Sequence, residues 1–142
     1  MKISARNVFQ GKITAIQPGS VNTEVEVTLG GDDRITAIVT NGSAQKLGLI
    51  TGKAATVLVK ASSVLVMTDG NGITLSSRNI LPGKVTRLSN GPVSSEVGIT
   101  LPSGATVHAT ITHDAVSELG IKEGTSASAV FKASSVILGV AS

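Results

Sequence analysis

The feature that most constrains this chain of 142 residues is an internal repeat with a constant offset of 72 positions. The tetrapeptide Ser-Ala-Arg-Asn at residues 4–7 returns as Ser-Ser-Arg-Asn at 76–79, and Lys-Ala-Ser-Ser-Val at 60–64 returns unchanged at 132–136. Because no insertion separates the two copies, the sequence indicates that one small unit was duplicated. We therefore predict two domains, residues 1–70 and 71–142.

Size and composition limit what these domains can be. A domain of about 70 residues buries only about 60% of its unfolded surface, so we expect the copies to pack on each other, on other chains, or on both. Hydrophobic residues make up 41% of the chain and charged residues 15%, as in a globular protein. The net charge of +3 can attract small anions, but it does not indicate a polybasic tail.

The sequence shows no sign of export or membrane insertion. It has no cysteine, which excludes disulfides and thiolate metal sites and is compatible with a reducing cytoplasm. Its first residues hold no apolar signal core, and no apolar run approaches the ~18 residues that a membrane span needs. We therefore expect a cytoplasmic protein that does not contact the membrane.

Alternating apolar and polar residues predict short strands in each copy. In residues 24–29, three apolar side chains alternate with three polar ones, which is typical of a half-buried strand. Residues 11–16, 35–39 and 55–66 are also strand-like, the last on both sides of its Lys-Ala-Ser segment. The same order returns in the second copy at 93–101, 106–111 and 127–138.

Each copy also carries one short helical segment. Residues 40–48 have a capping residue near their start and a glycine at their end, and residues 114–120 take the same place in the second copy. Residues 69–72 have the composition of a turn and form the linker. We therefore predict an all-β fold of two tandem OB-like small barrels, each with about five strands and a short helix.

The polar residues that recur in both copies are of the kind that holds an anion. Arg6 and Lys60 each lie two positions from a serine, so in an extended segment both side chains leave the same face. Thr40 and Ser43 lie at the expected helix start, where free N–H groups favour an anion. Such a lining of donors suits a tetrahedral oxyanion and not a metal cation. The alternative that serine and asparagine cap turns, while arginine and lysine are solvated, stays open.

The recurring residues resemble the molybdate-binding Mop domain, also called the molbindin or TOBE-type domain. The similarity is carried by Ser-Ala-Arg-Asn-Val-Phe-Gln-Gly at 4–11, Val-Asn-Thr-Glu-Val at 21–25 and Lys-Ala-Ser-Ser-Val at 60–64, with the same marks in the second copy. It extends over essentially the whole chain. Two copies without a helix-turn-helix or a Gly-x-x-x-x-Gly-Lys-Ser/Thr loop resemble the free-standing di-domain molbindins of the cytoplasm.

This resemblance implies reversible binding of molybdate and tungstate, for intracellular storage, buffering or metal homeostasis. It implies no catalysis and no organic cofactor, and the molybdenum would be held as its oxyanion without direct metal ligands. It also implies a homo-oligomer, a trimer, with anion sites at subunit interfaces.

The resemblance also implies which residues line these sites. In the first copy they are Ser4, Arg6, Thr40, Ser43, Lys60, Ala61 and Ser62. In the second copy they are Ser76, Arg78, Thr112, Lys132, Ala133 and Ser134, while Ala115 replaces the hydroxyl of Ser43. A second type of site is implied at Val21 and Asn22, with Val93 and Ser94 as the equivalents.

Two alternatives to this function stay open. An OB-type barrel can bind single-stranded nucleic acid, but stacking needs aromatic platforms beside a basic groove. Phe9 and Phe131 are the only aromatic residues, and they are not equivalent in the repeat. A structural oligomer that binds anions generically would show the same donors as a molybdate store.

The sequence does not favour an enzyme. His108 and His113 match Thr36 and Asn41 of the first copy, so neither belongs to the repeated set, and we interpret both as surface or turn residues. The repeated glutamates at 24 and 96 alternate with valines on a strand. We interpret them as solvated or interface carboxylates, because a general base would need a partner that the sequence does not offer.

Overall fold

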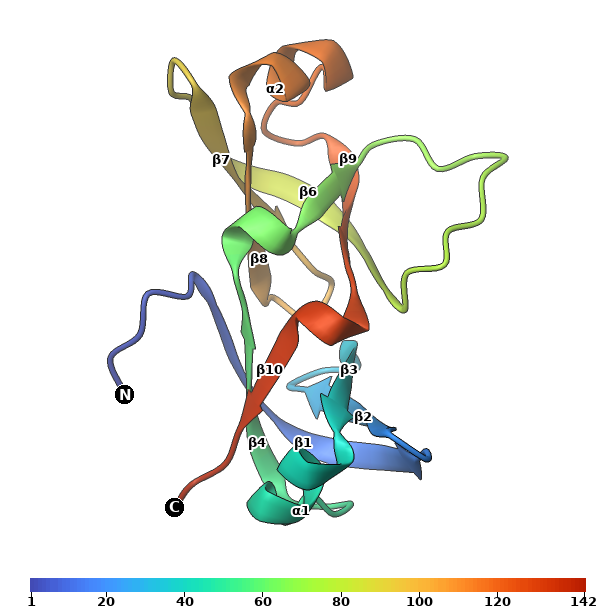
Figure 1. Ribbon diagram of the computed structural model, residues 1–142. Coiled ribbons are helices and arrows are strands. Elements are labelled where there is room, and N and C mark those ends of the chain that lie inside the picture. The colour runs from blue at the N-terminus through green and yellow to red at the C-terminus, as the bar shows by residue number, and fades with distance from the viewer.

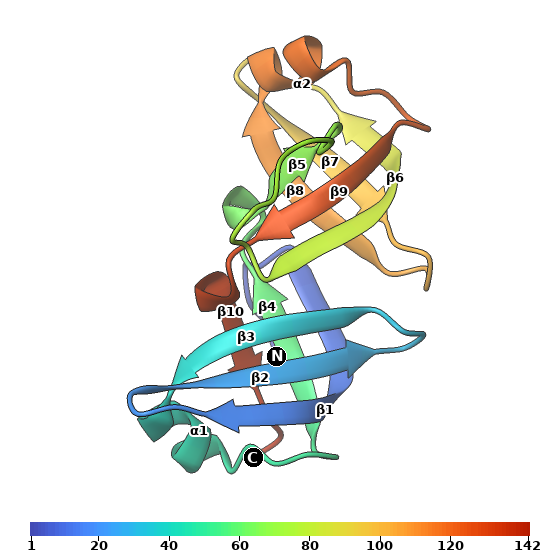
Figure 2. The same ribbon diagram turned by 90° about the vertical axis from the view of Figure 1, so that its right-hand side faces the viewer.

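The computed structural model describes residues 1–142 and consists of two five-stranded antiparallel sheets placed end to end (Figure 1 and Figure 2). The first half of the chain forms β1 (Asn7–Pro18), β2 (Asn22–Leu29), β3 (Arg34–Thr40), α1 (Asn41–Leu47), β4 (Ala54–Val59), the 3-10 turn η1 (Ala61–Ser63) and β5 (Leu65–Met67). The second half forms β6 (Asn79–Ser89), β7 (Ser94–Thr100), β8 (Thr106–Thr112), α2 (His113–Leu119), β9 (Ser126–Phe131), the 3-10 turn η2 (Ala133–Ser135) and β10 (Val136–Gly139). The predicted all-β class, with one short helix in each repeat, is confirmed.

The last strand of each repeat belongs to the sheet of the other repeat. The sheets have the strand orders β10-β4-β1-β2-β3 and β5-β9-β6-β7-β8. Val136 of β10 lies opposite Val59 of β4, and Leu65 of β5 lies opposite Val130 of β9. In Figure 1 the red C-terminal strand therefore runs into the half that holds the blue N-terminal strand. Each sheet takes four strands from one half of the sequence and its fifth from the other.

Each sheet curls around an apolar core. Val25, Val27 and Ile35 are fully buried, as the alternation in β2 and β3 predicts, while the intervening glutamates point outward. The long strands β1 and β6 pair with a neighbour on both sides, and both change register at equivalent threonines, Thr14 and Thr86. Such bulges increase strand twist. They let β10 approach β3, which gives the curled sheet its OB-like shape.

Two repeated glycines allow the close approach on which this curling depends. A Cβ atom built on Gly11 would lie 2.6 Å from the carbonyl oxygen of Thr28 on β2, and one on Gly83 would lie 2.3 Å from that of Thr100 on β7. No side chain fits at either position without moving the neighbouring backbone.

No helix of the structure is long and apolar enough to cross a membrane.

The strand exchange predicts which part of the fold a C-terminal truncation destabilises. Truncation after Ser135 removes β10 and its buried Val136 and Leu138, so amide protons of β4 that face β10 should lose protection from hydrogen exchange. The loss is expected in the first half of the sequence although the deletion lies at the end of the second. Truncation after Val140 is the control and should leave protection unchanged. Loss of protection confined to the second repeat would contradict the exchange.

Candidate functional site

The site is positioned by two buried asparagines that fasten each repeat to the other. Asn79, 1% exposed, donates from Nδ2 to the carbonyl oxygen of Thr36 at 2.8 Å and accepts the Thr36 N–H at Oδ1, also at 2.8 Å. Asn7 makes the equivalent pair of bonds to the backbone of His108, at 2.8 and 2.7 Å. Both amide groups therefore bond the backbone of β3 and β8, which gives these recurring asparagines a structural role.

The arginine that precedes each asparagine reaches a glutamate of the other repeat. Arg78 donates from Nη1 to Oε2 of Glu24 at 2.6 Å and from Nη2 to Oε1 at 2.7 Å. Arg6 donates from Nη1 to Oε2 of Glu96 at 2.7 Å, and its Nη2 lies 2.5 Å from Oε1. Both glutamates are therefore carboxylates of an interface between the repeats, one of the two interpretations that the sequence allowed.

In the second repeat, the structure brings five of the six predicted residues around one cavity of about 180 Å³. The lining residues are Ser76, Ser77, Arg78, Lys132, Ala133 and Ser134, together with Ile38 of the first repeat. The turn η2 reaches Ile38 because it packs against β3. The cavity therefore combines a guanidinium, an ammonium and several hydroxyls, with one apolar wall.

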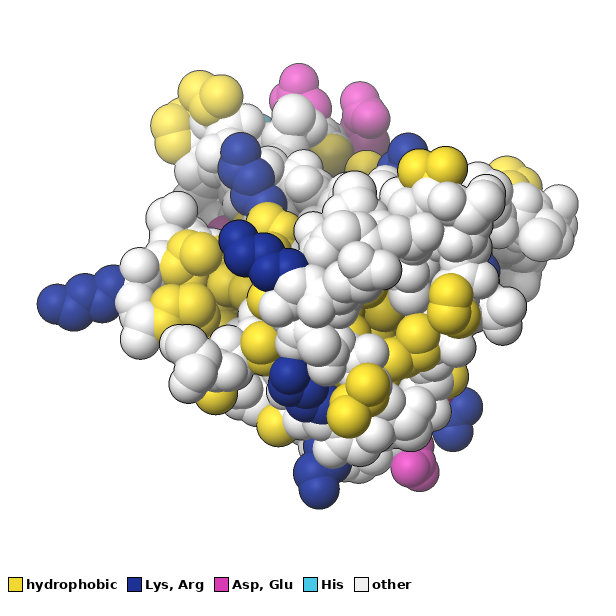
Figure 3. All heavy atoms as spheres, turned by 60° about the horizontal axis from the view of Figure 1, so that its bottom comes forward, with side chains coloured by type: hydrophobic (Ala, Val, Ile, Leu, Met, Phe, Trp, Pro, Cys, Tyr) yellow, Lys and Arg dark blue, Asp and Glu magenta, His cyan; other side chains and the backbone are white.

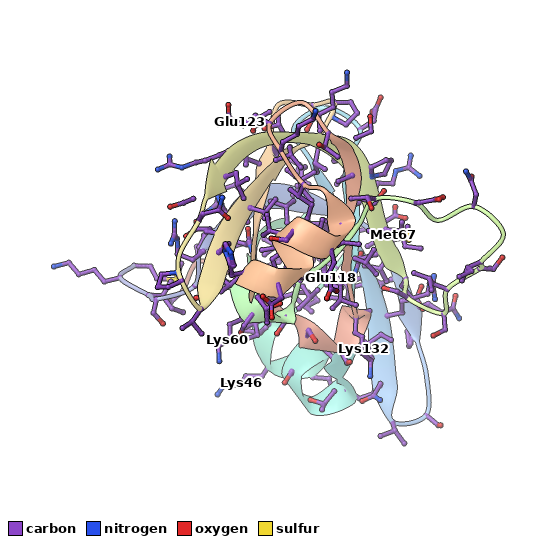
Figure 4. The ribbon with its side chains drawn as sticks, turned by 90° about the horizontal axis from the view of Figure 1, so that it is seen from above. Lys46, Lys60, Met67, Glu118, Glu123 and Lys132 are labelled. Atoms are coloured by element: carbon purple, nitrogen blue, oxygen red, sulfur yellow. The ribbon has the colours of Figure 1, made fainter.

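The first repeat places its equivalent residues against β8. Ala61 is buried at 5% exposure where η1 packs on that strand, while Ser4, Lys60 and Ser62 are exposed. Figure 4 shows the side chains of Lys60 and Lys132 at the two turns. The strand residue opposite Glu96 is Thr110, whereas the one opposite Glu24 is Ile38. The two clusters therefore share their charged groups, and the strand residue opposite the glutamate is apolar in one and polar in the other.

The remaining predicted hydroxyls do not line the cavity. Thr40 and Ser43 are at the start of α1 and Thr112 is at the start of α2, and the two helices occupy opposite ends of the molecule (Figure 1). Thr40 Oγ1 accepts the Ser43 N–H at 3.1 Å and donates to Ser43 Oγ at 2.9 Å. Thr112 caps Ala115 N–H in the same way at 3.1 Å. The N–H groups of Ser43 and Ala115 are therefore occupied by the caps and are not free for an anion.

The residues predicted for the second type of site lie at two exposed hairpin turns. Val21 and Val93 are 71% and 80% exposed, and the adjacent Asn22 and Ser94 are exposed as well. Asn41 holds the first turn, since its N–H donates to Val21 O at 3.0 Å and its Nδ2 to Gly19 O at 2.9 Å. Sequence reasoning missed Asn41 because its repeat equivalent is a histidine, so the repeat does not mark it.

The histidines considered for catalysis and the phenylalanine considered for base stacking lie in or beside secondary-structure elements. His108 is on β8 with Nδ1 3.4 Å from Glu96 Oε1, and His113 is the first residue of α2. No group of three or more histidine, aspartate or glutamate residues is arranged to hold a metal ion. Phe131 is 2% exposed, which removes it as a platform for stacking bases.

Fold and site together define a class of protein, a duplicated OB-like barrel that carries a donor-lined cavity between its repeats. A family model described as the TOBE domain matches residues 3–66 and 75–138, once for each repeat, and the chain belongs to this family. The match confirms the family that the sequence motifs indicated.

Named relatives and a solved structure agree with this assignment. The chain is 46% identical to the molybdenum transport protein ModE of Herbaspirillum seropedicae and 37% identical to the molybdenum-pterin-binding protein MopA of Rhodobacter capsulatus. Both alignments cover 99% of this chain, but the chain spans only about half the length of these relatives. A crystal structure of the cytoplasmic molybdate-binding protein ModG with molybdate bound is 52% identical, with a TM-score of 0.96 over 99% of this chain and 100% of that one.

The asparagine anchor generates a stability prediction. Asn79→Ala leaves the partly buried N–H and C=O of Thr36 without partners, and a fully buried group of this kind costs about 1–3 kcal/mol. The free energy of unfolding should therefore fall by at least about 1 kcal/mol in urea denaturation. Asn71→Ala, in the exposed linker, is the matched control and should change little. Equal effects of the two substitutions would contradict the anchoring role of Asn79.

Proposed function

We propose that this protein binds molybdate, and tungstate of the same shape and charge, as intact oxyanions, and that it serves as a cytoplasmic store or buffer. The observation that carries the proposal is the cavity in which Arg78 and Lys132 meet the hydroxyls of Ser76 and Ser134. The molybdate-bound structure of ModG, similar over the whole chain, supports this choice of anion and the cytoplasmic location.

The chemistry of the cavity fits a small oxyanion held without covalent change. Guanidinium, ammonium and hydroxyl groups donate hydrogen bonds, and bonds to a charged partner are worth about 1.5–3 kcal/mol each. A few of them, less the cost of removing a dianion from water, would give a dissociation constant of about 1 μM. We propose that residues 1–70 and 71–142 are two domains that exchange their last strands, and that each supplies the charged donors of one class of site.

We propose further that the sites are completed by a second copy of the chain. Thr40, Ser43 and Thr112 lie at the helix starts and are not among the residues that line the cavity. In a homo-oligomer, the helix end of one copy can approach the charged cluster of another. The exposed turns at Val21 and Val93 would then lie near the symmetry axis of a trimer and form the second type of site.

Exposed apolar side chains at equivalent positions support such an assembly. Val8 and Ile80 are each 38% exposed, and Leu65 and Ile137 are each 64% exposed. Figure 3 shows apolar side chains open to solvent on one face, with lysine and arginine side chains between them. Apolar surface that is kept in both repeats, and that no strand of the same chain covers, is typical of an interface between subunits.

The function is tested by calorimetric titration of molybdate, tungstate, sulfate and phosphate in parallel. All are tetrahedral anions, so discrimination depends on pocket size and on the reach of fixed donors. Molybdate and tungstate should bind at about micromolar concentration, and molybdate at least about tenfold more tightly than sulfate. Equal binding of sulfate would support the generic anion-binding alternative instead.

The same calorimetric titration with single lysine variants tests which residues line the sites. Lys132→Ala removes one cation that faces the dianion, so affinity should fall about tenfold to a hundredfold at the fraction of sites that Lys132 lines. Lys60→Ala should do the same at the sites of its own class, and Lys122→Ala, in an exposed turn, should change nothing. Loss of all binding in either variant, or no loss in both, would contradict the division between the repeats.

The assembly is tested by light scattering with and without molybdate. The mass should be a multiple of the 14.3 kDa chain, with three copies expected, and molybdate should stabilise the assembly because binding and association are linked. Leu65→Glu places a charge on the apolar surface and should shift the mass toward one chain. A monomer that binds molybdate at full stoichiometry would contradict sites shared between subunits.

A further inference from the structure

The guanidinium groups of the two charged clusters are each already held by a carboxylate of the same chain. We propose that Glu24 and Glu96 are internal competitors of the anion: each occupies the N–H groups of its arginine until a dianion displaces it, so that they act as a charge filter. The proposal rests on the proposed function, because it assigns to these glutamates the selectivity of the same sites.

The geometry places the competitor at the edge of the cavity. Glu24 engages Arg78 with both oxygens, at 2.6 and 2.7 Å, which leaves two fewer guanidinium N–H groups for a ligand. Glu24 also lies directly opposite Ile38 across β2 and β3, and Ile38 lines the cavity beside Arg78. Side chains at directly opposite positions of an antiparallel pair have Cβ atoms only about 5 Å apart. The carboxylate and an anion in the cavity would therefore compete for the N–H groups of Arg78 from adjacent positions.

The exposure of the pair makes it displaceable. The side chains of Arg78 and Glu24 are 54% and 33% exposed, and exposed ion pairs stabilise only weakly. The released carboxylate can be hydrated where it lies. A tethered carboxylate nevertheless acts at a high effective concentration, so a dilute monovalent anion of equal charge does not replace it. A divalent oxyanion interacts with the two cations of the cavity through twice the charge, and can.

The second competitor has one additional neighbour. Glu96 holds Arg6 in the same way, and its Oε1 also lies 3.4 Å from Nδ1 of His108. The equivalent neighbour of Glu24 is Thr36, which carries no ionisable group. When Arg6 turns to an anion, Glu96 therefore retains a potential hydrogen-bond partner that Glu24 lacks. We accordingly treat the two competitors as separate tests of one mechanism.

The test is calorimetric titration of molybdate into Glu24→Gln, which keeps the shape of the side chain and removes its charge. Affinity at the sites that contain Arg78 should rise about twofold to tenfold, since the anion no longer displaces a charged partner. Nitrate at millimolar concentration should begin to compete in the variant and not in the parent. Glu26→Gln is the matched control, because Glu26 lies two positions along the same strand face and bonds Thr14 instead of an arginine.

The outcomes separate this proposal from the proposed function. Failure of the parent protein to bind molybdate would overturn both. Binding by the parent with unchanged or weaker affinity in Glu24→Gln would overturn the competitor alone, and would make Glu24 a residue that positions Arg78 or joins the repeats. If Glu24→Gln does not fold, Glu24→Asp provides the test. Its shorter side chain should hold Arg78 less well, so this variant should bind molybdate more tightly than the parent. Glu96→Gln should act on the sites that contain Arg6.

Discussion

The exchange of the last strands between the two sheets is the constraint on which the rest of the structure depends. To deliver β5 and β10 to the opposite sheet, the chain crosses between the sheets at η1 and η2. Those crossings carry Lys60 and Lys132 against β8 and β3, which are strands of the other repeat. The cavity at Lys132 consequently has walls from both halves of the sequence. A binding site between the repeats is a consequence of how the sheets are completed.

Much of the local structure could be predicted from the sequence, because it depends on neighbours in the chain. The alternation in residues 24–29 fixes which side chains of β2 face the core, and Thr40 and Gly48 cap α1 at its two ends. The repeat also identified Arg78, Lys132 and Ser134 as one set, and the structure brings these three together at the cavity. Residue types that recur at a fixed offset are informative even when the contacts between them are not known.

The long-range pairing could not be predicted, for a physical reason. Residues 65–67 and 137–139 are equivalent in the repeat and largely apolar, so the sequence does not distinguish which sheet each of them completes. In the structure a 3-10 turn precedes each of these strands, and the strand after it joins the other sheet. The partner of Arg78 was hidden for a similar reason, since Glu24 alternates with valines in the way that any solvated strand residue does. The chemistry of a carboxylate at a strand surface does not reveal which cation lies opposite.

The duplication allows the two sites to diverge without loosening their framework. Asn79 bonds the backbone N–H and C=O of Thr36, and Asn7 bonds those of His108, so neither anchor depends on the side chain at the position that it holds. Any residue that keeps the strand conformation can therefore stand at 36 and 108. The same freedom applies to Ile38 and Thr110, whose side chains face the charged clusters while their backbones stay in the sheet. Differences in wall polarity and in the neighbours of the glutamates thus tune each site separately, while the arginine, the lysine and the asparagine stay in register through the backbone.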